Sequence, residues 1–191
     1  MAFLTRCRRA RKVRARHTYS VVFACLLASG ARLFGQGAPS GEYQVKAVFL
    51  FNLAQFVEWP PKAFADPGAP LVVGVLGEDP FGSYLDETLR GERAHNRPLL
   101  LQHYRRVSEV RVCHVLFISR SETDRLDQIF AAVRGRSVLT VGDADEFISR
   151  GGMIGLVTEK NKIRIRINAE AVRAAGLTIS SKLLRLALPG S

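Results

Sequence analysis

The chain has 191 residues, of which 47% are hydrophobic and 24% charged, and its formal net charge is +11. Such a charge is typical of proteins that bind nucleic acids or membrane surfaces, but its distribution argues against that function here. Eight of the 28 Lys and Arg residues and none of the 17 Asp and Glu residues precede residue 38, which leaves 20 cations against 17 acids in the rest of the chain.

Residues 1–37 predict a secretory signal peptide. An Arg-rich stretch over residues 6–16 precedes an apolar stretch over residues 19–28, and small residues then allow cleavage after Gly30 or Gly37. The apolar stretch is shorter than the roughly 20 residues of a membrane-spanning helix. We therefore expect residues 38–191 to lie in the periplasm and to form one domain, since about 150 residues suffice for a hydrophobic core.

The segment from Glu42 to Glu58 predicts a helix that is apolar on nearly every side and ends before Trp59-Pro60. Its three phenylalanines cannot all face one sheet, so at least one is a candidate for a contact with another chain. The same choice applies to Trp59, which either covers the domain's own core or anchors a partner. The residues concerned are Phe49, Phe51, Phe56 and Trp59.

The next segments alternate between apolar runs and helical patterns. Strands are predicted over residues 71–76, 98–104, 113–118 and 137–141. Helices are predicted after Asp79-Pro80 and after a capping box at residues 121–124. A short helix through residues 147–148 would be capped by Asp143 and Glu146.

The last segments predict a hairpin from residues 153–158 and 162–168, a helix over residues 169–175 with Asn168 as its cap, and a short helix or strand over residues 180–187. Strands that alternate with helices favour an α/β fold. We predict a single domain of three-layer type, with a mainly parallel sheet and one antiparallel hairpin at its edge.

The rim beyond the carboxyl ends of the strands is the default ligand pocket of such a sheet. Its polar residues would be Glu78, Asp79, Ser119 and Asp143. The histidines show no metal-ligand spacing, and no Gly-x-Ser-x-Gly motif is present. Cys113 is the one cysteine after the signal peptide and is expected to be buried. The sequence therefore predicts no catalytic residues, no cofactor and no metal site.

Three cations, Lys162, Arg164 and Arg166, alternate with isoleucines in the second strand of the hairpin. They either form a solvated face that discourages aggregation through the sheet edge, or an electropositive strip that meets an acidic partner.

Two motifs resemble the YfiR family of periplasmic regulators, and the match extends from about Glu42 to Ala187. The first motif comprises Lys46-Ala47, Phe49-Leu50, Phe56 and Trp59-Pro60. The second comprises Gly151-Gly152-Met153-Ile154, residues 161–168, Ala171, Ala174, Gly176-Leu177 and residues 179–187. Between them, residues 74–77 and 79–81 also fit.

The resemblance implies a compact α/β domain without known catalytic activity. The family's named member binds the periplasmic part of a membrane-bound diguanylate cyclase and represses the synthesis of cyclic di-GMP. We therefore expect an exported, non-enzymatic regulator that binds such a cyclase or a sensor kinase and forms a homodimer. Its partner-binding residues would be Phe49, Phe51, Phe56, Trp59, Lys162, Arg164 and Arg166. The alternative is a periplasmic small-ligand-binding protein that uses the rim pocket.

Overall fold

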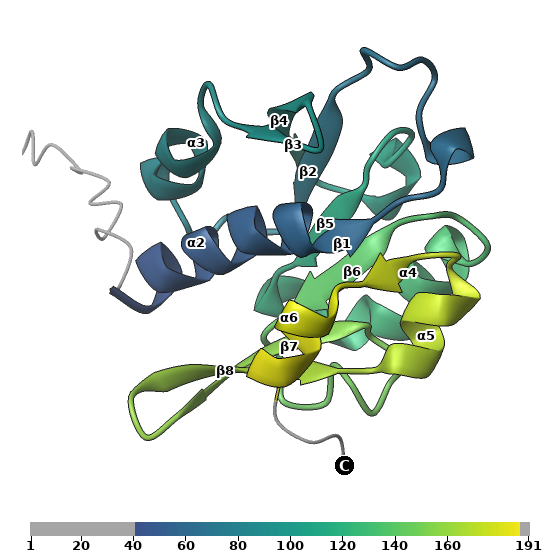
Figure 1. Ribbon diagram of the computed structural model, residues 1–191. Helices are drawn as coiled ribbons and strands as arrows, with labels where there is room; N and C mark the ends of the chain where they lie inside the picture. Colours follow the sequence, from purple (N-terminus) through teal and green to yellow (C-terminus); the bar gives the residue numbers. More distant parts are fainter. Residues whose placement is uncertain (1–40, 188–191) are drawn as a thin grey trace, which may run out of the picture. The chain divides into compact units, whose positions relative to one another are not determined.

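A computed structural model describes residues 41–187, so the predicted signal peptide lies outside the described residues. A seven-stranded sheet in the order β3-β4-β2-β5-β6-β7-β8 forms the middle of the domain (Figure 1). Strands β4, β2, β5, β6 and β7 run parallel, whereas β3 and β8 pair antiparallel at the two edges. The strands are β2 (Leu71–Leu76), β3 (Arg93–Ala94), β4 (Arg97–Tyr104), β5 (Val115–Ile118), β6 (Leu139–Gly142), β7 (Ile154–Glu159) and β8 (Lys162–Ile167).

Helices cover both faces of the sheet, because its central strands are apolar on both sides. Every residue of β2, β5 and β6 is buried. One core cluster joins the sheet to α2, α3, α5 and α6, and a second joins its other face to α4. These helices are α2 (Gly41–Phe56), α3 (Ser83–Leu89), α4 (Leu126–Val133), α5 (Ala169–Ala174) and α6 (Ser181–Leu186). The predicted α/β domain with an antiparallel edge hairpin is thus confirmed.

Helix α2 buries one stripe of small and branched side chains rather than its aromatic rings. The fully buried apolar residues are Ala47, Leu50, Leu53 and Ala54, at positions i, i+3, i+6 and i+7, which lie on one helix face. The phenylalanines flank this stripe, and all of them are partly buried against the core. The most exposed apolar side chains of the helix are instead two valines, Val45 at 47% and Val48 at 49%.

The hairpin of β7 and β8 closes through a two-residue turn. Lys160 and Asn161 have φ values of 49° and 60°, the left-handed conformation at both positions that type I′ hairpin turns require. The turn fixes the pairing of Glu159 with Lys162 and of Thr158 with Ile163. As a result Ile165 points into the core, while Lys162 and Arg164 remain exposed at the edge of the sheet.

A second, two-stranded sheet joins the two ends of the domain. Strand β1 (Val57–Glu58) directly follows α2 and pairs antiparallel with β9 (Thr178–Ile179). The amide of Ser180 also donates a hydrogen bond to the carbonyl oxygen of Phe56, at 2.9 Å. The expected helix therefore ends two residues early, because Val57 and Glu58 are recruited into a strand. Three 3₁₀ turns complete the described elements: η1 (Pro61–Ala63), η2 (Val107–Glu109) and η3 (Arg120–Arg125).

Three predicted helix starts are wrong. Asp79 accepts a hydrogen bond from the amide of Phe81 in a local turn, and α3 begins only at Ser83. Ser121 does not cap a helix, because its hydroxyl accepts the amide of Glu78, while Ser119 caps η3 ahead of α4. Residues 145–151 form turns rather than a helix. Asp143 is not a cap and has another role, described below.

A buried histidine and a partly buried tryptophan anchor the loop after β1. His114, 2% exposed, accepts the amide of Val72 at Nδ1 and contacts the carbonyl oxygen of Ala63 through Nε2 at 3.1 Å. The indole of Trp59 donates to the carbonyl oxygen of His114 at 3.3 Å. Cys113 is buried, as predicted, and burial raises the pKa of its thiol to about 12.

We expect His114 to make the domain less stable in acid. Burial, with a smaller contribution from the charge of Arg97, lowers the pKa of His114 below its usual 6.5. At a pH between the two pKa values, His114 is therefore protonated in the unfolded chain but neutral in the folded domain. The free energy of unfolding then falls as pH drops below about 6.5. Urea unfolding between about pH 7.5 and pH 5.5 measures this slope. The slope should shrink in His114→Gln and persist in His103→Gln, which alters an exposed histidine; equal slopes in both variants would contradict the assignment.

Candidate functional site

A fully buried ion pair lies where α2 crosses the carboxyl end of β6. Lys46 and the side chain of Asp143 are both inaccessible to solvent, and Lys46 Nζ lies 2.6 Å from Asp143 Oδ2. Asp143 occupies this position because it directly follows the last residue of β6, and Lys46 because it stands in the buried stripe of α2. The pair compensates two charges that would each be costly to bury alone.

Three further groups surround this pair. Tyr43 donates a hydrogen bond to Asp143 Oδ2 at 2.9 Å, and burial together with this bond raises the pKa of Tyr43. Arg120 donates to the backbone carbonyl of Asp143, at 3.1 and 3.2 Å. Glu42 lies 2.5 Å from Lys46, and the hydrogen bond from Lys46 lowers the pKa of Glu42. Asp143 Oδ1 is buried without a hydrogen-bond partner among the described residues.

The predicted rim pocket is divided in the structure. Ser119 and Asp143 are buried, whereas Glu78 and Asp79 are exposed, and Asp79 contacts His103 at 3.1 Å. Glu78 lines a shallow depression of about 420 Å³, but its other side chains are Arg105, Ser121, Glu122 and Arg125. Lys46 and Tyr43 instead occupy the space next to Asp143. The four residues therefore do not line one common pocket there.

The predicted partner-binding residues are also divided. Phe49 and Lys162 meet in a groove of about 500 Å³ between the N-terminal half of α2 and the β7–β8 hairpin, together with Val45 and Ile163. We call this depression the α2–hairpin groove. It is the place where the structure brings apolar and cationic members of the predicted set together.

The other members of that set lie elsewhere or are engaged. Phe51, Phe56 and Trp59 are partly buried against the core, and Trp59 also packs edge-on against His95 and His114. Arg164 is exposed on β8, whereas Arg166 is paired with Glu159 at 2.9 Å.

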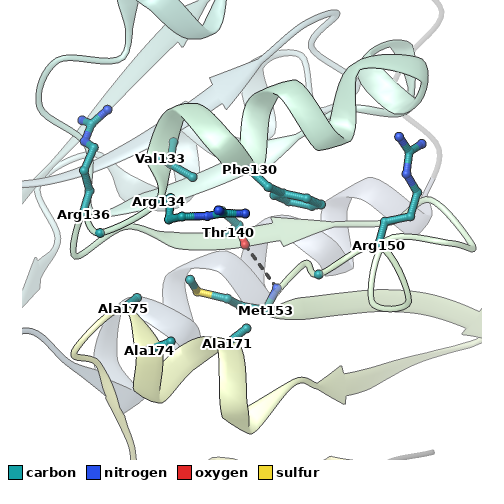
Figure 2. Close-up of a pocket in the computed structure, with 12 residues that line it drawn as sticks. Phe130, Val133, Arg134, Arg136, Thr140, Arg150, Met153, Ala171, Ala174 and Ala175 are labelled. Carbon is teal, nitrogen blue, oxygen red and sulfur yellow. Dashed lines mark hydrogen bonds between the residues drawn. The ribbon is translucent and has the colours of Figure 1, made fainter.

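A cleft of about 230 Å³ opens on the other side of the domain, between α4, α5 and the ends of β6 and β7. Its floor is Thr140, whose hydroxyl accepts the amide of Met153 at 3.1 Å. Arg134 lies across the cleft beside Phe130 (Figure 2). Small side chains of α5 leave this space open, namely Ala171, Ala174 and Ala175. Two further arginines line the cleft, and both are engaged: Arg136 donates to the carbonyl oxygen of Arg111, and Arg150 pairs with Asp127.

A family model described as YfiR/HmsC-like matches residues 43–188. The chain belongs to the YfiR/HmsC-like family. This family is regulatory and non-catalytic, and its members act in the periplasm with membrane signalling proteins. No curated protein matches the chain.

The structure gives physical roles to residues of the YfiR-like motifs. Lys46 forms the buried ion pair, and Trp59 fastens the chain after α2 to the residue before β5. Sequence reasoning missed Lys46, Tyr43 and Arg120 as parts of one cluster. The available signal was a lysine in the same helix face as Leu50, Leu53 and Ala54, since a lysine on a buried apolar face needs a buried partner. Among the described residues, no cluster of His, Cys, Asp or Glu could hold a metal ion, and no helix has the length and apolar content needed to cross a membrane.

Proposed function

We propose that this chain is an exported, non-enzymatic regulator that binds the periplasmic domain of an inner-membrane diguanylate cyclase and controls the synthesis of cyclic di-GMP. The observation that carries this proposal is the YfiR/HmsC-like match over residues 43–188. The predicted signal peptide at residues 1–37 supports the export that such a role requires.

The surface of α2 also supports a binding role. Val45 and Val48 are each about half exposed, on a helix whose remaining apolar residues are buried or partly buried. Adjacent apolar side chains left uncovered beside polar ones are typical of protein-binding sites. The α2–hairpin groove places Val45 and the partly buried Phe49 next to the cation of Lys162.

A regulator of this kind needs no chemistry of its own. It shifts the cyclase toward an inactive conformation by binding that conformation more tightly than the active one. A tenfold difference in affinity, worth about 1.4 kcal/mol, changes the ratio of the two cyclase states tenfold once the regulator is saturating.

Deletion of the gene in its own host tests the proposal. We expect the deletion to raise cellular cyclic di-GMP, and the full chain supplied in trans to restore the original level. A chain that lacks residues 1–37 should fail to restore it, since that chain stays in the cytoplasm. Deleting the diguanylate cyclase as well should abolish the effect of the first deletion. Unchanged cyclic di-GMP in the first strain, with the protein verifiably expressed in the parent, would contradict the proposal.

A further inference from the structure

The α2–hairpin groove has an apolar floor, and the carboxylates and cations around it differ in whether they have partners within the domain. Its carboxylates are already engaged: Glu42 pairs with Lys46 and accepts the hydroxyl of Thr158 at 2.9 Å, and the adjacent Glu159 pairs with Arg166. Their negative charge is therefore compensated within the domain.

The cations of the hairpin are not compensated in this way. Lys160, Lys162 and Arg164 are exposed, and within residues 41–187 none of them forms an ion pair. Lys162 lines the groove, whereas Lys160 lies in the turn beside it and Arg164 lies further along β8, outside the groove lining. The groove thus presents apolar side chains next to a positive rim.

This charge pattern discriminates between possible occupants. A second copy of the chain, docked through a twofold axis at this groove, would bring two copies of Lys162 into one interface, with the exposed cation Lys160 in the turn beside each of them. Like charges that face each other across an interface are destabilising. A homodimer of the kind predicted from the sequence would therefore use another surface.

We propose that the α2–hairpin groove binds an acidic, amphipathic segment of the partner protein, with apolar side chains against Val45 and Phe49 and a carboxylate against Lys162. This inference rests on the proposed function and specifies which part of the partner is recognised. The apolar contacts supply most of the affinity, while the charges set the association rate and the choice of partner.

Two groove variants and two matched controls test the inference. Val45→Asp places a carboxylate among the apolar side chains, and Lys162→Glu reverses a rim charge. Both positions are exposed, so the fold should tolerate the changes, and circular dichroism verifies this. The controls make the same types of change on α6, where Leu184 and Arg185 are also exposed: Leu184→Asp and Arg185→Glu.

The measurement is the affinity of the processed protein, residues 38–191, for the periplasmic domain of the inner-membrane diguanylate cyclase that the proposed function requires. We expect Val45→Asp to weaken binding by about 10- to 100-fold, as hot-spot substitutions do. Lys162→Glu should weaken it roughly 10-fold and reduce its dependence on salt. The two α6 variants should bind like the unaltered protein.

Each other outcome overturns a distinct statement. If the groove variants bind like the unaltered protein, the groove inference is wrong and the proposed function stands. If the unaltered protein does not bind this domain, the proposed function fails and the inference with it. Light scattering that shows a dimer dissociated by Val45→Asp would make a second copy the occupant instead. If the protein sediments with phosphatidylglycerol vesicles and Lys162→Glu abolishes this sedimentation, the occupant of the groove would be an anionic membrane.

Discussion

Replacing Lys46 with methionine should destabilise the domain by about 3–5 kcal/mol, because it leaves the buried carboxylate of Asp143 without its cation. Lys46 and Asp143 are both inaccessible to solvent, and Arg120, whose Nε lies 3.5 Å from Asp143 Oδ2, compensates only in part. This loss is a large fraction of the roughly 5–15 kcal/mol that stabilises a typical domain. Urea unfolding followed by circular dichroism measures it.

A second substitution separates the charge from the packing. Asp143→Asn removes the negative charge and keeps an oxygen that accepts the hydroxyl of Tyr43. Added to Lys46→Met, it should recover at least about half of the lost stability, since replacing both members of a buried pair is often nearly neutral. Glu42→Gln is the matched control: Glu42 contacts the same lysine but is 32% exposed, so its loss should cost less than about 1 kcal/mol. If Asp143→Asn destabilised the Lys46→Met variant further, the ion pair would not be what holds this end of α2.

Gly142→Ala should destabilise the domain by about 1–3 kcal/mol through overpacking. A Cβ atom at residue 142 would overlap the ring of Phe147, which is fully buried and packs edge-on against Phe130 at a centroid distance of 5.4 Å. Phe147→Ala alone should cost about 3–5 kcal/mol. The double variant should cost clearly less than the sum of the two, since the added methyl group then enters the space that the ring vacates.

Gly152 supplies the control for this cycle. A Cβ atom there would also overlap the Phe147 ring, but it would in addition lie 2.6 Å from the backbone carbonyl oxygen of Phe147. Gly152→Ala should therefore stay destabilising when Phe147 is replaced by alanine. Denaturant unfolding of all five variants gives both coupling energies. Additive effects for Gly142→Ala and Phe147→Ala would show that the strand moves away from the ring instead.

Local patterns in the sequence were sufficient to predict the strands of the sheet and its edge hairpin. The apolar run at residues 71–76 and the strict alternation of Lys162 to Ile167 each correspond to a strand with the expected burial. Asn168 caps α5 as predicted, because the cap and the amide it binds are only three residues apart. Such interactions are readable because both partners lie within one segment.

The buried cluster could not be predicted, since its partners are far apart in the chain. Asp143 and Lys46 are separated by 97 residues, and nothing local distinguishes an aspartate that caps a helix from one that pairs with a distant lysine. The rim pocket remains a prediction, and what the sequence could not foresee is that Lys46 and Tyr43 of α2 stand next to Asp143. For the α2–hairpin groove, the sequence predicted that apolar and cationic side chains would take part in binding. It could not show that Phe49 lies apart from Phe51 and Phe56, because that depends on how α2 is oriented against the sheet.

The small sheet formed by β1 and β9 has a consequence for how the chain acquires its structure. It links the end of α2 to residues 178–179, and α2 also contacts β8 and α6. The packing of α2 is therefore incomplete until the C-terminal elements of the domain are present. Contacts between such distant segments slow folding, because a long loop must close before they form. The polypeptide should therefore remain incompletely folded until nearly all of it has been synthesised, and its final assembly should be a late, cooperative event. An incompletely folded chain is also what the export proposed above requires.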